Sequence, residues 1–239
     1  MKFDNDFTTR SKLKDIGRWY VTRFVQQVAQ MLPTGSRVLD AGAGECAYKK
    51  VFTQSRYVSV DLAVGEPSWN YHNLSCIGVL DRLPFKDESF AAVLCPQTLE
   101  HLEWPRECVR EFFRVLKPGG RLFLTVPMTH AEHQAPYDFF RYTSFGIKSI
   151  CRDAGFAKSE ITPFGGMFTR MAYELPRIQS VIPSSGLKAG RLRLKGLFFL
   201  PIKVVLLIVI RLVQFVFLAL DRFDKTKDYP FGWGVMAQK

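Results

Sequence analysis

One short stretch, residues 37–45, constrains the fold of this chain more than any other. Residues typical of a buried strand end on the acid Asp40, and Gly42 and Gly44 follow with one residue between them. This order predicts a β-strand, a tight turn and a helix, because glycine lets a ligand approach the bare backbone N–H groups at a helix N-terminus. We therefore expect an α/β fold with a nucleotide-like ligand at the turn.

Two cofactors use this geometry. Residues 42–47 satisfy the Gly-x-Gly-x-x-Ala dinucleotide pattern, and Asp61 follows at about the distance expected for a ribose-binding acid. Asp40 favours the other cofactor, since a carboxylate at the end of the strand repels a pyrophosphate but pairs with an ammonium group. The amino-acid end of S-adenosylmethionine carries such a group, so a cofactor that is cationic at that end is expected.

Composition limits the remaining possibilities. The chain has 239 residues and is 47% hydrophobic, enough for one domain or one domain with an appendage. Its five cysteines are scattered without Cys-x-x-Cys pairing, which predicts neither a disulfide framework nor a zinc site and favours a reducing cytosol. Residues 1–14 lack the apolar core of a signal peptide. Of the net charge of +11, seven units lie in residues 186–227, so the excess belongs to a hydrophobic segment and not to a nucleic-acid groove.

Alternating patterns along the chain predict a doubly wound parallel sheet. Strands are expected at residues 37–41, 57–61, 91–95, 121–127 and 156–163, with a short third strand between residues 62 and 80. Helices are expected at residues 16–32, from Glu45 towards Phe52, from Pro105 to about residue 116 and from Ser144 to Gly155. The arginines of the third helix, Arg106, Arg110 and Arg114, are expected to point outward.

Several motifs occur together in this order. They are the Asp40 to Gly44 turn, the strand that ends at Asp61, Leu-Pro-Phe at residues 83–85 with Asp87, Ser89 and Phe90, Leu-Glu-His at residues 99–101, and residues 114–120 before a strand. The combination, over about residues 38–164, closely resembles the class I S-adenosylmethionine-dependent methyltransferases. It is similar in particular to the methyltransferase type 11-like, small-molecule subgroup, which includes quinone and sterol methylating enzymes.

The resemblance implies a Rossmann-like methyltransferase fold, with a doubly wound, mostly parallel sheet of seven strands whose last strand would be residues 232–237. It also implies S-adenosyl-L-methionine as cofactor. It assigns Asp40, Gly42 and Gly44 to the methionine part, Asp61 to the ribose, and Asp81 and Leu83 to the adenine side. Family members place an acid about four residues before the Leu-Pro-Phe leucine, where this chain has Val79. Asp81, the nearest acid, or backbone groups would then make the adenine contact.

The acceptor is expected beside residues 95–101 and 128–143, which follow the fourth and fifth strands, because ligands of open parallel sheets bind at the carboxyl ends of the strands. Methyl transfer needs orientation and a base where the acceptor must lose a proton, so His133 and then His101 are the candidate catalytic residues. Candidate substrate residues are Tyr137, Arg141 and Tyr142. The alternatives are hydrogen-bonding histidines, an internal Asp138–Arg141 ion pair and a metal bound by His130, Glu132 and His133; the last is disfavoured, so no metal is expected.

The segment of residues 196–220 is long enough to cross a bilayer but contains Lys203, Arg211 and Gln214. On a helical wheel its polar residues form one arc, which predicts a helix lying in the membrane interface with basic residues toward anionic head groups. A core helix, a dimer interface and a transmembrane span are alternatives. The expected domains are a methyltransferase domain at 1–185, a membrane-associating insertion at 186–227 and a C-terminal strand at 228–239, with the protein on the cytoplasmic face of the membrane.

These features predict an enzyme that methylates a small or lipid-linked acceptor near the membrane surface. An NAD(P)-dependent oxidoreductase and a catalytically inert methyltransferase-like interaction module remain alternatives. Nucleic acid is not an expected partner, since no Pro-Pro-Tyr motif follows the fourth strand.

Overall fold

The computed structural model describes residues 9–65, 68–181, 187–188, 191–192 and 200–239. The described residues form two compact units. One holds residues 20–164 and 232–239, and the other holds residues 9–19 together with the described part of 165–231. The expected domain boundaries at residues 185 and 227 remain predictions.

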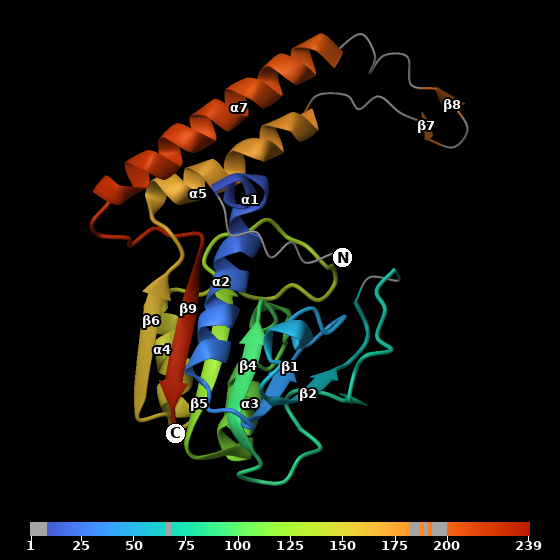
Figure 1. Ribbon diagram of the computed structural model, residues 1–239, viewed down its shortest axis with the longest axis vertical. Helices are drawn as coiled ribbons and strands as arrows, with labels where there is room; N and C mark the ends of the chain where they lie inside the picture. The colour runs from blue at the N-terminus through green and yellow to red at the C-terminus, as the bar shows by residue number, and fades with distance from the viewer. Residues whose placement is uncertain (1–8, 66–67, 182–186, 189–190, 193–199) are drawn as a thin grey trace. The chain divides into compact units, whose positions relative to one another are not determined.

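The first unit is built on a seven-stranded sheet (Figure 1). Its spatial order is β3 (Cys76–Ile77), β2 (Arg56–Asp61), β1 (Arg37–Ala41), β4 (Phe90–Pro96), β5 (Leu116–Pro127), β9 (Gly232–Gln238) and β6 (Lys158–Pro163). Strand β9 runs antiparallel to both of its neighbours, and the other pairs are parallel. The predicted fold class is confirmed, including the C-terminal strand that completes the sheet.

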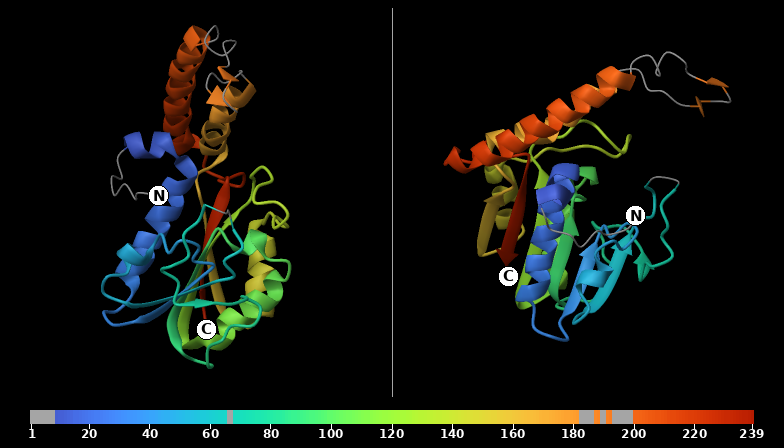
Figure 2. Two further views of the ribbon diagram at one scale, coloured as in Figure 1. Left: turned by 90° about the vertical axis from the view of Figure 1, so that its right-hand side faces the viewer. Right: turned by 45° about the horizontal axis from the view of Figure 1, so that its top comes forward.

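Helices cover both faces of this sheet. Residues 20–31 of α2 (Ile16–Met31) lie on one face, and α3 (Pro105–Val115) and α4 (Ser144–Asp153) lie on the other (Figure 2). Strand residues alternate between the faces, so Leu39 and Val93 enter the core beneath α3 and α4 while Val38 and Ala92 face the other way. Both sets are fully buried, which explains the nearly continuous apolar runs in the sequence.

Parallel pairing places two acids at one edge of the sheet. In the β1–β2 register Asp40 is opposite Ser59 and Ala41 is opposite Val60, so Asp61 ends β2 level with the start of the glycine turn. The carboxyl ends of β4 and β5 reach the same edge. The candidate cofactor acids and the segments that follow β4 and β5 therefore lie at one edge of the sheet.

The helix expected after Glu45 is wrong. Turns and a short 3-10 helix, η1 (Lys49–Val51), occupy residues 45–52 instead. Cys46 has a φ of 57°, a left-handed conformation that breaks an α-helix in its first turn. The helix predicted from Pro105 to about residue 116 ends at Val115, because Leu116 already begins β5.

The second unit holds the hydrophobic segment. In it α7 (Leu200–Leu220) packs against α5 (Met167–Glu174) and α1 (Thr9–Lys14), and the remaining short elements are η3 (Leu175–Val181), β7 (Leu187–Lys188), β8 (Arg191–Leu192) and η4 (Asp221–Phe223). The carboxylate of Asp221 accepts the N–H groups of Gly166 and Thr169 at the start of α5. Residues 196–199 of the expected helix lie outside the described residues.

Part of the polar arc of α7, which the sequence predicts to face anionic head groups, is buried within the second unit. Gln214 is 1% exposed and donates to the Ala172 carbonyl at 2.8 Å, and Arg211 donates to Gln214 and to the Leu13 carbonyl. Polar groups turn inward because backbone carbonyls there complete their hydrogen bonds. The exposed side chains of α7 are apolar instead: Ile202, Val204, Val205, Leu207, Ile208, Val209, Leu212, Phe215 and Val216.

Among the described residues, one helical stretch, Pro201–Phe223, is long and apolar enough to cross a membrane, with a mean hydropathy of 2.5. Only 11% of the most apolar 18-residue part of this stretch is buried.

Candidate cofactor and acceptor sites

The glycine turn after β1 is fixed by its surroundings. Gly42 has a φ of 80°, and a methyl group added at its Cα would lie 2.1 Å from the Thr98 side chain. Its N–H donates to the Val60 carbonyl at 2.9 Å, and the Thr98 hydroxyl donates to its carbonyl at 3.3 Å. Only glycine fits this position without displacing the chain.

Asp40 is completely buried at the end of β1. The Tyr57 hydroxyl donates to its Oδ2, whereas its Oδ1 has no hydrogen-bond partner among the described residues. Burial raises the pKa of the Asp40 carboxyl to about 7, and the bond from Tyr57 offsets only part of the rise. A buried carboxylate oxygen without a partner fits a ligand that brings a positive charge or a donor.

Asp61 sits beside it at the end of β2. Its Oδ2 accepts the Gly44 N–H at 2.9 Å, and its Oδ1 accepts the Ala63 N–H at 2.8 Å. Each oxygen keeps a further lone pair, so the two remaining acceptors suit a pair of hydroxyl groups such as those of a ribose. The two backbone bonds hold the carboxylate in one orientation.

The Leu-Pro-Phe segment is clamped by α3. Leu83 is buried, its N–H donates to Glu111 at 2.7 Å, and its carbonyl accepts from Arg114 at 3.1 Å. Arg114 also donates to the Phe85 carbonyl and to Asp87, so its expected outward orientation is wrong. These bonds explain why the Leu-Pro-Phe and Arg114 motifs occur together. Cofactor contacts by Leu83 and by the exposed Asp81 remain predictions.

On the acceptor side, His101 ends η2 (Leu99–His101). Its Nδ1 lies 2.5 Å from the Tyr137 carbonyl oxygen. Because a carbonyl only accepts, Nδ1 carries the proton and the neutral ring leaves a lone pair on Nε2. That Nε2 is buried without a hydrogen-bond partner among the described residues and lies 3.9 Å from Glu100 Oε1. Burial lowers the pKa of His101, which favours the neutral ring.

Glu100 is a site residue that the sequence analysis missed. Its side chain is 1% exposed, and its Oε2 has no partner in the described part of the chain. Burial raises the pKa of this carboxyl to about 8. The Leu-Glu-His motif was the available signal, but the pattern of a short 3-10 turn did not reveal which of its residues points inward.

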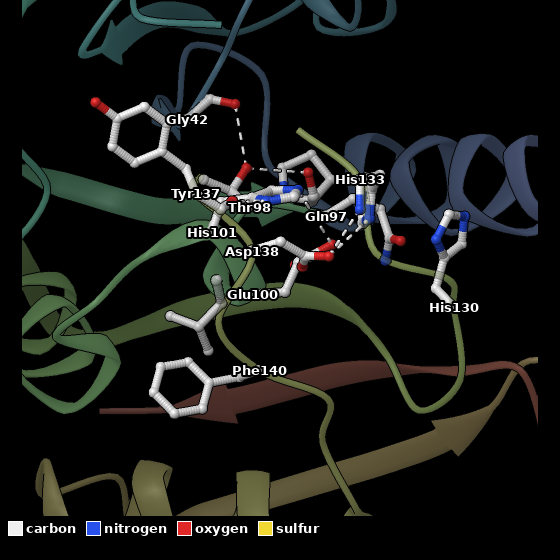
Figure 3. Close-up of polar contacts among 12 residues, drawn as sticks. Gly42, Gln97, Thr98, Glu100, His101, His130, His133, Tyr137, Asp138 and Phe140 are labelled. Carbon is white, nitrogen blue, oxygen red and sulfur yellow. Dashed lines mark hydrogen bonds and ion pairs between the residues drawn. The ribbon is translucent and has the colours of Figure 1, made fainter. Parts of the chain in front are cut away.

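His133 lies against the same group (Figure 3). The backbone N–H of His133 donates to Asp138 Oδ2 at 2.9 Å. Its ring Nδ1 is 3.1 Å from the Ala131 carbonyl oxygen and 3.3 Å from Asp138 Oδ2. Both neighbours are acceptors, so Nδ1 is again the protonated nitrogen. The rings of His101 and His133 meet edge to face at 4.7 Å between centroids.

An ion pair fixes this loop. Asp138 accepts two hydrogen bonds from Arg141, at 2.7 and 2.8 Å, and they hold the pKa of Asp138 below its usual range. Arg141 also donates to the carbonyls of His130, Ala131 and Phe140. The internal ion pair considered from the sequence is therefore present.

The predicted substrate residues have different surroundings. Tyr137 is 45% exposed, next to His101. Tyr142 is buried, its hydroxyl donates to the Leu99 carbonyl, and its backbone carbonyl accepts from the Trp233 indole, so it anchors the loop in the core. Substrate contacts by Tyr137, Arg141 and Tyr142 remain predictions.

Comparison with known proteins agrees with this geometry. A family model described as a methyltransferase domain matches residues 39–124. A ubiquinone biosynthesis O-methyltransferase of Pseudomonas fluorescens is 27% identical over 105 residues, which cover 38% of this chain and 44% of the relative. A ubiquinone/menaquinone biosynthesis C-methyltransferase of Pseudoalteromonas translucida is 33% identical over 81 residues, which cover 30% and 32%.

The fold extends beyond the methyltransferase domain match. A phosphoethanolamine N-methyltransferase of Haemonchus contortus, solved with S-adenosyl-L-methionine, aligns with 91% of this chain and 52% of its own, with a TM-score of 0.53 and 16% identity. The fold is thus that of the class I S-adenosylmethionine-dependent methyltransferases. The chain spans less than half the length of the two curated relatives above.

The methyltransferase domain match contains the glycine turn, Asp40, Asp61, Glu100 and His101, but it ends before the loop of His133, Tyr137 and Arg141. The candidate cofactor residues therefore lie within the matched range, and the loop of His133, Tyr137 and Arg141 lies outside it.

Proposed function

We propose that this protein transfers a methyl group from S-adenosyl-L-methionine to a small or lipid-linked acceptor at the cytoplasmic face of a membrane. One observation carries the proposal: the buried Oδ1 of Asp40, which has no partner among the described residues, beside a turn that only glycine fits. A ligand ammonium satisfies that oxygen, whereas the pyrophosphate of a dinucleotide places negative charge against it. The oxidoreductase alternative is therefore disfavoured.

The cofactor supplies, when bound, a methyl group on a sulfonium sulfur. Asp40 and the glycine turn bind its amino-acid end, Asp61 accepts its ribose hydroxyls, and Asp81 and Leu83 lie toward its adenine. The acceptor lies beside residues 95–101 and 128–143, with Tyr137, Arg141 and Tyr142 in its surroundings. Where the acceptor loses a proton, an imidazole lone pair receives it, at His133 first and at His101 second, because carbonyl groups hold both rings with Nδ1 protonated.

The membrane part of the proposal rests on α7. Nine exposed apolar side chains on one helix form a surface that water solvates poorly, and Lys203, Arg222 and Lys225 flank it with positive charge. A lipid-linked acceptor would then be present at the surface where the enzyme is held.

Calorimetry tests the cofactor. The purified protein is titrated with S-adenosylmethionine, its demethylated product and NADH, alongside Asp61→Asn and the exposed control Glu103→Gln. Loss of a charged hydrogen-bonding group should weaken binding of the first two ligands by roughly 10- to 100-fold in Asp61→Asn and leave the control unchanged. Binding of NADH alone would contradict the proposal, and binding of none by a folded protein would favour the inert module.

Vesicle sedimentation tests the membrane. The protein should pellet with vesicles containing about 30% anionic lipid, and the double variant Val205→Glu/Leu212→Glu should stay in the supernatant. Lys49→Gln and Lys50→Gln on η1 together are the charge-matched control, because both double variants lower the net charge by two. If the parent protein stays in the supernatant and light scattering shows a dimer, the apolar face of α7 would instead bind a second copy of the chain. Resistance to carbonate extraction from cell membranes would indicate a spanning helix.

A further inference from the structure

The acceptor edge contains a set of metal-ligand atoms that the methyl-transfer proposal does not explain. Glu100, His101 and His133 each offer one ligand atom, and these atoms all lie within 4.8 Å of one another. Glu100 Oε2 and His101 Nε2 are buried without hydrogen-bond partners in the described residues. Groups of this kind are costly to bury unless something binds them.

The surroundings orient these side chains as metal sites orient their ligands. A ring nitrogen that binds a metal must be unprotonated, and the opposite N–H is normally held by a carbonyl or a carboxylate. His101 donates from Nδ1 to the Tyr137 carbonyl, and His133 has the Ala131 carbonyl and Asp138 at its Nδ1. Arg141 in turn fixes Asp138 with two hydrogen bonds.

We propose that Glu100, His101 and His133 bind a divalent transition-metal ion that in turn binds the acceptor oxygen. Two imidazoles and one carboxylate suit Zn²⁺ and similar ions, whereas Mg²⁺ prefers oxygen ligands alone. Tetrahedral zinc with bonds of about 2.0–2.1 Å places its ligands roughly 3.4 Å apart, so the side chains draw together on binding. Three protein ligands leave a coordination position open for the acceptor.

The inference rests on the proposed function and replaces its histidine base. An acceptor hydroxyl on the ion has a lowered pKa and releases its proton to solvent. The oxygen then forms the bond to the methyl carbon while the carbon–sulfur bond breaks, and the sulfur keeps the electron pair as the neutral thioether. The substrate class is thereby an alcohol, phenol or enol.

Direct metal binding tests the site without any assay of activity. The protein is stripped with a chelator, dialysed and titrated with Zn²⁺, Mn²⁺ and Mg²⁺ by calorimetry. One Zn²⁺ per chain is expected, bound more tightly than Mn²⁺ and far more tightly than Mg²⁺. Glu100→Gln, His101→Gln and His133→Gln should each weaken Zn²⁺ binding at least about tenfold, as removal of a ligand does.

The neighbouring imidazole of His130, 4.4 Å from the His133 ring but outside the cluster, provides the control His130→Gln, which should bind Zn²⁺ like the parent. X-ray absorption should show nitrogen and oxygen ligands; sulfur ligands would place the zinc on cysteine and overturn the inference. Unchanged binding in His133→Gln, or no binding by the parent, would also overturn it.

S-adenosylmethionine binding is measured on the same stripped samples and variants. Cofactor binding without metal binding leaves the proposed function standing with a histidine base. Metal binding without cofactor binding leaves the metal site standing and removes the methyltransferase proposal. Retained cofactor binding in the variants also shows that each of them is folded.

Discussion

At the scale of single residues, burial keeps the carboxyl of Asp40 partly protonated, so its protonation state changes when a charged ligand binds. Asp40 has a pKa of about 7 without ligand because it is desolvated. A cationic ligand binds the ionised form, so binding below that pKa must release a proton. We expect the affinity for S-adenosylmethionine to fall roughly tenfold between about pH 7 and pH 5.5. Calorimetry across this range measures it, and an equal affinity at both ends would contradict a contact with Asp40.

The same desolvation predicts a stability change. In the wild-type protein the folded-state pKa of Asp40 is above its unfolded value of about 3.9, so its contribution to stability falls as the pH rises from about 4 to 7. Asp40→Asn, which can still accept from Tyr57, should therefore stabilise the ligand-free protein by roughly 1–3 kcal/mol at about pH 8 and much less at about pH 4. Thermal melts measure this, and a melting temperature of Asp40→Asn below that of the wild-type protein at about pH 8 would refute it.

Residues at this scale differ in how far sequence could find them. Asp40, Gly42 and Asp61 were predictable because each sits at a strand end, where chain order alone sets position. Glu100 was missed, since its burial depends on contacts with residues 139 and 140, whose N–H groups bond its carbonyl. The sequence could suggest the pairing of Asp138 with Arg141, but not that it orients His133.

At the scale of elements, the Arg114 clamp links α3 to residues 83–87. Arg114→Gln removes hydrogen bonds to two carbonyls and two carboxylates, so we expect a loss of about 2–4 kcal/mol. Arg110→Gln, which breaks one exposed contact to Glu107 at 3.6 Å, should change stability by less than about 0.5 kcal/mol. Urea unfolding compares the two, and equal effects would show that the clamp adds nothing.

The clamp also has an expected pH dependence. Hydrogen bonds from Arg114 lower the pKa of Glu111 from its usual value. A lowered folded-state pKa means that the stability is present above the unfolded pKa of about 4.3 and is lost as the pH falls through the folded value. Arg114→Gln should therefore flatten the acid side of the stability profile, whereas Arg110→Gln should leave it unchanged.

The hydrophobic pattern of the sequence predicted the positions of the helices and strands better than the direction in which their side chains face. The strands were predicted from nearly continuous apolar runs, and the amphipathic helix α3 was predicted because one of its faces is apolar. The wheel of α7 separated polar from apolar residues correctly but could not tell that α5 and Leu13 accept hydrogen bonds from the polar side. The break after Glu45 depends on the backbone of Cys46, which no pattern of side chains specifies.

At the scale of the whole molecule, residues 165–231 leave the sheet after β6 and return to it in β9. Pro163 pairs with Trp233, and the Phe164 N–H donates to the Gly232 carbonyl at 2.9 Å, so the segment begins and ends at one point of the sheet. An Asn-Gly pair joining Phe164 to Gly232 would close an ordinary two-residue β-hairpin.

A variant in which this Asn-Gly pair replaces residues 165–231 should still fold, because the described sheet residues pair among themselves and the proposed cofactor residues all lie between residues 40 and 83. Its affinity for S-adenosylmethionine should stay within about threefold of the parent, a change of less than about 1 kcal/mol. Its sedimentation with anionic vesicles should be lost together with α7. Circular dichroism, calorimetry and sedimentation are measured on one preparation. A deletion that folds but no longer binds the cofactor would show that residues 165–231 contribute to the cofactor site, and one that still sediments would place membrane binding outside α7.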